Sequence, residues 1–290
     1  MKPSLLETLL DPSQLSVCFQ PIFHIHSRAN QVYSLEALIR GPRGTNLHRA
    51  DVLFDYVRRK KAEAAVDQSC FAAICHAATG LPSNLRINVN VHASTLGHGS
   101  GFVSYLRSQA KKHSLGLERL TVEIVEHSPT LNVLELLHSL ASLREDGVRI
   151  ALDDVGLGQS NYRMIVDCNP EYFKLDSYFV HGLRADSNRR AVVKSLIALA
   201  GAMGSSVVAE GVESKEDLSE LVSMGVDLVQ ANLLCPAKPL EDLSAAGLLG
   251  AATTKPLSGV DQALNSWKEG AKSLPQQQGS TDVCRPTSSP

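Results

Sequence analysis

The sequence predicts an α/β fold, a (β/α)8 TIM-type barrel whose first strand is antiparallel to the others. From about residue 15 to about residue 240, short apolar runs alternate with longer helical patterns. This alternation indicates βαβ units and a mainly parallel sheet, and eight candidate strands in such a span fit a barrel. Only a short turn separates the first two strands, whereas a parallel pair needs a crossover of roughly a dozen residues. A doubly wound open sheet is the alternative, but the polar strand ends favour the barrel.

The expected strands are short apolar runs, and most end in polar residues. The first two, 16–23 and 33–40, flank a turn with Ser27, Arg28, Ala29 and Asn30. The later strands are 86–91, 120–126, 149–154, 172–176, 206–210 and 227–231.

Apolar residues at helical spacing place helices between these strands. In the clearest helix, which ends at Gly147, the apolar residues at helical spacing are Val133, Leu136, Leu137, Leu140 and Leu143. Further helices are expected near 49–60, 62–78, 101–113, 187–203 and 213–224, with a short one after residue 154.

The chain divides by composition into a lead-in at 1–14, a barrel domain at 15–248 and a tail at 249–290. The tail is rich in Pro, Gln, Ser and Thr, so we expect it to be flexible. Within it, Val260, Leu264 and Trp267 could form one face of a short helix. That helix would dock on its own barrel or bind a protein partner.

Charge and cysteine content exclude several classes of protein. The 290 residues carry 28 Lys and Arg against 30 Asp and Glu, a net charge of −2, which gives no basic excess for a nucleic-acid polymer. No apolar run approaches the roughly 18 to 20 residues of a membrane span, and MKPSLLETLLDPSQL is a poor signal peptide. The six cysteines form no C-x-x-C pair and fit neither a zinc knuckle nor a disulfide framework. We therefore expect a cytoplasmic protein.

Polar residues gather at or near the ends of the expected strands. In a barrel these ends project from one face, where the βα loops build the active site. About five negative charges would meet there against one lysine, and such a cluster repels itself unless cations bind. The candidate ligands are all oxygens, which suits Mg2+ or Mn2+ and argues against zinc. These residues are Glu36, Asn90, Glu123, Asp153, Asp154, Lys174, Asp176, Glu210 and Gln230.

Asp153 and Asp154 are adjacent in this set. On a regular strand their side chains would diverge to opposite faces. We therefore expect the strand to end between them, so that both can reach a metal.

Several motifs resemble the EAL-domain family of cyclic-di-GMP phosphodiesterases. The three letters E-A-L stand at 36–38, and further motifs follow in the family's order and spacing over about 15–245. The resemblance implies a (β/α)8-type barrel with a reversed first strand. It also implies hydrolysis of cyclic di-GMP to linear pGpG with Mg2+ or Mn2+, and a homodimer. The motifs are FQPI at 19–22, VNVHAS at 89–94, VEIVE at 122–126, ALDDVGLG at 151–158, FKLD at 173–176, VVAEGVE at 207–213, VQA at 229–231 and AKP at 237–239.

The resemblance implies a two-metal site. Asp153 would bridge the two ions, helped by Asp154 and by Glu210. Ca2+ is expected to inhibit, because its ligand distances are about 2.3–2.6 Å against about 2.0–2.1 Å for Mg2+. The residues that resemble metal ligands are Glu36, Asn90, Glu123, Asp153 and Asp154.

Catalytic and substrate residues follow from the same resemblance. Lys174 resembles the family's catalytic lysine, acting together with Glu36 and Glu210. Glu213 resembles the glutamate that anchors the loop at 153–161. The residues that resemble substrate-contacting positions are Gln20, Leu38, Arg40, Asp176 and Gln230.

The sequence of that loop departs from the family pattern. The family pattern resembles DDFGTGYSS, whereas residues 153–161 of this chain read DDVGLGQSN. Leu157 replaces a threonine whose hydroxyl could tether the loop to Glu213, a difference of roughly 1 kcal/mol. Ala231 also replaces a glycine beside Gln230. We therefore expect an intact metal site under a less firmly held loop. The alternative function is a catalytically weak or inactive domain that acts as a cyclic-di-GMP receptor or protein-interaction module. Every metal-ligand position of the family pattern is filled in this chain, which favours the enzyme.

Three other patterns have simpler interpretations. His24 and His26 form the H-x-H of amidohydrolase barrels, yet no histidine follows His181 on the later strands. The glycines of GLGQSN at 156–161 lack the third glycine of a dinucleotide fingerprint. The basic run at 58–61 is interpreted as a solvated helix face.

Overall fold

A computed structural model describes residues 3–25, 31–125, 132–157 and 162–249 of the chain. Some expectations fall outside these residues. They are the turn at 27–30, His26, Gln159 and Asn161, and the tail at 250–290 with Val260, Leu264 and Trp267.

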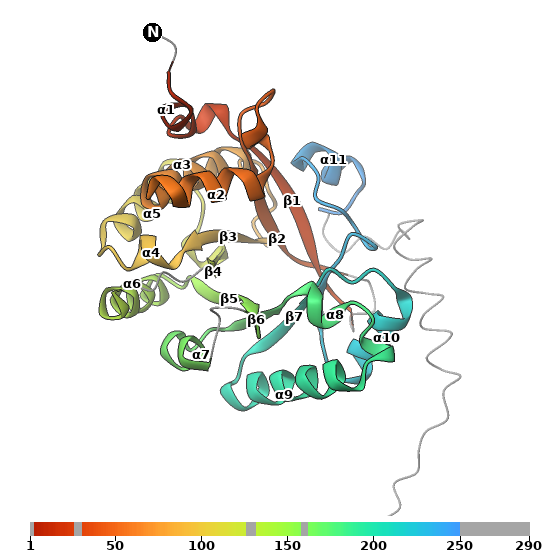
Figure 1. Cartoon of the computed structure of the whole chain (residues 1–290). Coiled ribbons are helices and arrows are strands. Elements are labelled where there is room, and N and C mark those ends of the chain that lie inside the picture. The colour runs from red at the N-terminus through yellow and green to blue at the C-terminus, as the bar shows by residue number, and fades with distance from the viewer. Residues whose placement is uncertain (1–2, 26–30, 126–131, 158–161, 250–290) are drawn as a thin grey trace, which may run out of the picture.

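Eight strands close into a barrel in chain order (Figure 1). β1 (Ser16–His24) runs antiparallel to both of its neighbours, β2 (Gln31–Arg40) and β8 (Leu228–Gln230). The other neighbouring strands are parallel. The predicted barrel with an antiparallel first strand is therefore confirmed, and the open sheet is excluded. The remaining strands are β3 (Arg86–His92), β4 (Leu120–Val125), β5 (Arg149–Val155), β6 (Tyr172–Leu175) and β7 (Ser206–Glu210).

The reversed direction of β1 decides which of its residues reach the carboxyl end of the barrel. Ser16 pairs with Arg40 at that end, whereas His24 pairs with Gln31 at the opposite end. Gln20 lies beside Glu36 midway along the strand. His24 therefore lies at the amino end of the barrel, remote from the carboxyl end at which an H-x-H metal site would form.

Helices cover the outside of the barrel in the described part of the chain (Figure 1). The predicted helices are present within a residue or two of their expected bounds, and several shorter helices were not expected. The longer helices are α2 (Ala50–Lys60), α3 (Glu63–Ala77), α5 (Gly101–Lys112), α6 (Val133–Glu145), α9 (Ser187–Met203) and α10 (Lys215–Ser223). The shorter helices are α1 (Leu5–Leu9), α4 (Ala93–Leu96), α7 (Tyr162–Cys168), α8 (Ser177–Val180) and α11 (Leu240–Ala245).

Capping residues explain where particular helices begin and end. α9 starts at Ser187 because the Asp186 side chain accepts hydrogen bonds from the backbone of Asn188 and Arg189. It ends at Gly204, which adopts the left-handed conformation with φ 73°. α10 was expected from residue 213, but Ser214 caps it and the helix begins at Lys215.

The barrel interior has an apolar layer beneath a polar layer. A small buried cluster contains Ile22, Ala151, Tyr172, Val208 and Leu228. Each of these residues lies two positions along its strand from a polar candidate residue, so both point to the same side of the sheet. The apolar residues fill the amino-terminal half of the interior, and the polar residues fill the carboxyl half. The polar partners are Gln20, Asp153, Lys174, Glu210 and Gln230.

None of the helices in the described ranges combines the length and the apolar character that a membrane crossing requires.

Candidate active site

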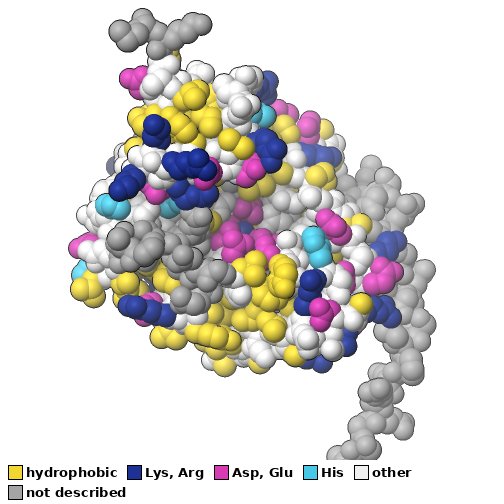
Figure 2. Space-filling model, viewed as in Figure 1, with side chains coloured by type: hydrophobic (Ala, Val, Ile, Leu, Met, Phe, Trp, Pro, Cys, Tyr) yellow, Lys and Arg dark blue, Asp and Glu magenta, His cyan; other side chains and the backbone are white. Residues whose placement is uncertain are grey.

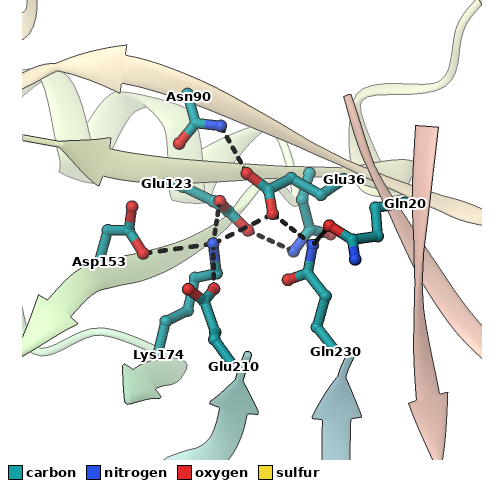
Figure 3. A network of polar contacts seen from close by, with 9 residues as sticks. Gln20, Glu36, Asn90, Glu123, Asp153, Lys174, Glu210 and Gln230 are labelled. Carbon is teal, nitrogen blue, oxygen red and sulfur yellow. Dashed lines mark hydrogen bonds and ion pairs between the residues drawn. The ribbon is translucent and has the colours of Figure 1, made fainter. Parts of the chain in front are cut away.

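The ammonium group of Lys174 lies at the centre of the polar layer. This residue belongs to β6 and is 1% exposed. Its Nζ atom lies 2.6 Å from a carboxylate oxygen of Glu123 and 2.6 Å from one of Glu210. Asp153 and Glu36 follow at 3.2 and 3.3 Å (Figure 3). Carboxylates from four different strands therefore surround one cation.

Amide side chains hold the Glu36 carboxylate from two sides. Asn90 donates from Nδ2 to Oε1 of Glu36 at 2.7 Å, and Gln230 donates from Nε2 to Oε2 at 2.7 Å. Gln230 also donates to Oε1 of Gln20 at 3.2 Å. The Gln20 amide in turn donates to Oδ1 of Asn232 at 3.1 Å. Both carboxylate oxygens of Glu36 therefore accept hydrogen bonds, which fix the orientation of this side chain of β2.

Burial and the neighbouring charges shift the pKa values of the glutamates in this cluster. Burial, with the charge of Glu36, holds the pKa of Glu123 well above its ordinary value. Burial also raises the pKa of Glu210 to about 8, against the opposing effect of Lys174. For Glu36, burial is outweighed by Lys174 and by hydrogen bonds from Asn90 and Gln230, so its pKa lies below the ordinary value.

The lysine itself stays charged in this environment. Burial alone would lower the pKa of Lys174, but the carboxylates, Asp153 foremost, raise it well above its ordinary value. One ammonium cannot neutralise four carboxylates, so part of the cluster holds protons near neutral pH. Such a proton is a group that a bound cation can displace.

Asp153 and Asp154 both lie within a bulge of β5, which corrects one expectation. The strand does not end between them but continues to Val155. The pairing with β6 shifts register between Leu152 and Val155, and Asp154 takes the left-handed conformation with φ 50°. A bulge adds a residue to one strand and redirects the side chains around it. Asp153 thereby faces Lys174, while Asp154 lies exposed at the rim.

A pocket of about 410 Å³ opens beside the cluster. Leu38 and Arg40 line it from the end of β2, and Phe54 and Arg58 line it from α2. Glu36, Asn90 and Asp153 form its polar side. Figure 2 shows acidic side chains gathered at the centre of this face, with basic side chains above them. The size is within the range of small-molecule sites, which is roughly 300–1,000 Å³.

Besides Asp154 at the rim and Leu38 and Arg40 in the pocket, two predicted site residues lie away from the network around Lys174. Asp176 follows β6 and caps α8, accepting a hydrogen bond from the backbone of Tyr178 at 2.6 Å. Glu213 has a 73% exposed side chain, and its carboxylate lies 3.6 Å from Nε2 of His181. The structure gives each of these residues a local contact and does not bring either to the cluster within the described residues.

The described part of the 153–161 loop is packed against the barrel. Leu157 is half-buried against the hydrophobic core. Gly156 has φ 96°, and a Cβ atom there would lie 2.8 Å from the ring of Phe179. The glycine is thus required by the backbone and by the close approach of α8, in agreement with a loop glycine rather than a dinucleotide fingerprint.

The basic run is a helix surface, as expected. Arg59 and Arg58 lie in the last turn of α2, with nitrogens 2.8 and 3.8 Å from the carboxylate of Asp55. Exposed pairs of this kind contribute little to stability.

Two polar groups near the site were not expected from the sequence. Asn88 donates from Nδ2 to Oε1 of Glu123 at 2.7 Å inside the barrel. Asp67 on α3 accepts hydrogen bonds from His92, through both its backbone and its Nδ1, at 3.0 and 2.9 Å. The spacing along β3 could have indicated Asn88 and His92. Side chains alternate along a strand, so residues 88 and 92 lie on the same face as Asn90.

The donor set fits a hard divalent cation in its chemistry. Carboxylate and amide oxygens are abundant, and their negative charge exceeds that of the one lysine. Among the residues that the structure describes, however, no three His, Cys, Asp or Glu side chains are arranged as ligands of one ion. The carboxylates converge on the ammonium of Lys174 instead, which takes the position of the compensating cation.

These features define a TIM-barrel protein with a buried cluster of acids around a lysine at the carboxyl end of the barrel. The EAL domain family matches residues 4–237 of the chain. The chain therefore belongs to the EAL domain family, as the sequence motifs predicted.

Known relatives are phosphodiesterases by name. Cyclic di-GMP phosphodiesterase NbdA of Pseudomonas aeruginosa is 30% identical over 251 residues, which is 84% of this chain and 31% of that protein. Cyclic di-GMP phosphodiesterase PdeL of Escherichia coli is 30% identical over 159 residues, which is 55% of this chain and 44% of PdeL. The chain thus spans less than half the length of each of these two relatives.

Solved structures of the same fold include ligand complexes. The PaMucR phosphodiesterase in complex with c-di-GMP has a TM-score of 0.72 at 25% identity, and the match covers 82% of this chain and 97% of that one. A calcium and cyclic-di-GMP complex of BlrP1 from Klebsiella pneumoniae has a TM-score of 0.68 at 26% identity, covering 82% and 58%. A further BlrP1 structure is a manganese and cyclic-di-GMP complex.

Proposed function

We propose that this protein is a metal-dependent phosphodiesterase that hydrolyses cyclic di-GMP to linear pGpG. The observation that carries the proposal is the set of four carboxylates around buried Lys174 at the carboxyl end of an EAL-family barrel. The names of the relatives support the choice of substrate. A cyclic dinucleotide carries two phosphodiesters, and the pocket beside the cluster offers Arg40 as a positive partner for one of them.

Two Mg2+ or Mn2+ ions are the proposed cofactors. Glu36, Asn90, Glu123, Asp153 and Asp154 would hold them. Bound divalent ions would supply positive charge to the phosphodiester and lower the pKa of an attacking water. Ca2+ is expected to bind in their place and to inhibit, on account of its longer ligand distances.

The chain's own residues have distinct roles in this proposal. Lys174 provides a fixed positive charge where negative charge develops in the transition state. Burial raises the pKa of Glu210 to about 8, so its carboxyl group can hold a proton near neutral pH. Glu36, oriented by two amides, presents one oxygen toward Lys174.

Substrate positioning falls to residues around this centre. Leu38 and Arg40 contact the substrate from the pocket wall, and the linked amides of Gln20 and Gln230 contact it from β1 and β8. We propose Asp176 as a further substrate contact and Glu213 as the anchor of the 153–161 loop.

A homodimer is also proposed. Three large apolar side chains are more than two-thirds exposed on neighbouring helices: Leu134 on α6, and Tyr162 and Val166 on α7. Exposed apolar surface of this kind is a candidate contact between copies. A cytoplasmic location and a protein partner for the tail remain predictions of the sequence.

A direct assay tests the proposed reaction. The full chain is incubated with cyclic di-GMP and Mg2+, Mn2+ or EDTA, and the products are separated by chromatography. We expect pGpG with either ion, none with EDTA, and a fall in kcat larger than the rise in KM for Lys174→Ala. If only KM rises in that variant, Lys174 is a ground-state phosphate contact.

The second candidate function is a cyclic-di-GMP receptor. The observation that favours it is Leu157, which packs against the core where the family pattern has a hydroxyl. Calorimetric binding of cyclic di-GMP by the unmodified chain, with no pGpG formed in either Mg2+ or Mn2+, would establish the receptor instead of the enzyme.

A further inference from the structure

Two asparagines on β3 bind two carboxylates of the cluster in the same way. Asn90 donates to Oε1 of Glu36, and Asn88 donates to Oε1 of Glu123, both at 2.7 Å. In each glutamate the other oxygen, Oε2, lies toward Nζ of Lys174, at 3.3 and 2.6 Å. In Glu123 one amide therefore holds Oε1 and leaves Oε2 for the cation position, whereas Oε2 of Glu36 also accepts a hydrogen bond from Gln230 at 2.7 Å.

We propose that Asn88 is a positioning residue, which orients the Glu123 carboxylate so that Oε2 faces the cation position. The inference rests on the proposed function, since it assigns Glu123 to the same site. Asn88 touches neither Lys174 nor the pocket in any contact that the described residues show, so it acts through Glu123.

Packing alone does not explain an asparagine at this position. The side chain is 5% exposed, and its Oδ1 atom has no hydrogen-bond partner among the described residues. A buried acceptor without a partner is unfavourable, whereas an apolar side chain of similar size would carry no such penalty. With Glu123 ionised, as a metal ligand must be, the amide cannot be turned over either, because Oδ1 would then face a carboxylate oxygen. The Nδ2–Glu123 bond is the interaction that the asparagine provides.

Glu123 is the carboxylate most dependent on such support. It is 0% exposed, so water does not supply alternative partners for its oxygens. Without Asn88, the contact of Oε2 with Lys174 would remain but Oε1 would lose its amide donor, so the carboxylate would be less firmly oriented. Groups that orient a metal ligand typically change metal affinity or activity by about 10- to 100-fold when they are removed.

The test compares Mn2+ binding by isothermal titration calorimetry in four forms of the full chain. These are the unmodified protein, Asn88→Leu, Asn88→Ala and the control Thr121→Val. Thr121 is the register partner of Asn88 on β4 and is 1% exposed, so the control perturbs the same layer of the barrel. Circular dichroism and thermal unfolding establish which variants fold.

We expect both Asn88 variants to bind Mn2+ at least about 10-fold more weakly and the control to change less than about 2-fold. In turnover assays, kcat should fall with KM for cyclic di-GMP nearly unchanged. In a Glu123→Gln background, adding Asn88→Leu should change Mn2+ affinity less than about 2-fold, because the group it orients is already altered.

Unchanged Mn2+ affinity in a folded Asn88 variant would overturn the inference, as would an equal loss in Thr121→Val. A full loss from Asn88→Leu in the Glu123→Gln background would overturn it too, since Asn88 would then act by another route. These outcomes are separate from the proposed function. A chain that binds Mn2+ but forms no pGpG refutes the phosphodiesterase, while the Mn2+ titrations still decide the role of Asn88.

Discussion

Removal of the Lys174 ammonium is the change with the largest expected effect on stability. The substitution Lys174→Met keeps the length and apolar stem of the side chain but deletes the charge. Four carboxylates, two of them 2.6 Å from Nζ, would then face one another inside the barrel. Breaking a buried ion pair by removing one partner typically costs about 3–5 kcal/mol. For a domain of this size each kcal/mol lowers Tm by about 2–4 °C, so a fall of about 6–20 °C is expected.

The effect should depend on pH and on metal. At low pH the uncompensated carboxylates bind protons, and the loss becomes smaller as their charge disappears. At pH 8 they must either ionise against one another or retain protons at a free-energy cost, so the loss is largest there. Added Mn2+ should restore much of the lost stability, because it replaces the missing positive charge.

Thermal unfolding at pH 5.5 and pH 8, measured once in EDTA and once in Mn2+ without EDTA, tests this. The matched control is Lys194→Met on exposed α9, which should change stability by less than about 0.5 kcal/mol. A Lys174→Met protein as stable as the unmodified chain at pH 8 in EDTA would show that the ammonium does not compensate the cluster, and the reasoning would fail.

Four further outcomes are expected. Glu36→Ala should reduce pGpG formation at least about 100-fold without loss of folding, since a catalytic metal supplies several kcal/mol; retained activity would contradict that role. Ca2+ should support cyclic-di-GMP binding but little turnover, and equal initial rates with Ca2+ and Mg2+ would argue against the two-metal site. Leu157→Thr should raise kcat or leave it unchanged; a several-fold fall at equal stability would count against a weakly held loop. The folded pKa of Glu210, about 8, lies above its unfolded value of 4.5, so its contribution to stability is present below 4.5 and is lost as pH rises through 8. In EDTA, Tm should therefore fall over that range, and Glu210→Gln should make the fall smaller.

Local patterns were sufficient for most of the secondary structure. The expected helix at 187–203 has the observed bounds, because Asp186 and Gly204 are strong start and stop residues. α8 was not expected, since four residues carry too little periodicity to be recognised. Its cap, Asp176, was instead grouped with the site by its place after a strand.

The bulge in β5 shows the limit of reasoning from strand periodicity. Two adjacent aspartates indicated an irregularity, and the sequence analysis placed a strand end there. The structure resolves the same conflict by a left-handed Asp154 within a continuing strand. Both solutions satisfy the local sequence, and only pairing with β6 distinguishes them.

Strand period, crossover length and residue type are local properties, so the barrel, its reversed first strand and the acidic character of one end could be predicted from the sequence. Two features emerge only from contacts between strands: the carboxylates converge on Lys174, and Asn88 donates a hydrogen bond to Glu123. Those contacts join residues on different strands, far apart in the chain. Their distances depend on barrel closure and register, in which a shift of one residue would turn each side chain to the other face of the sheet.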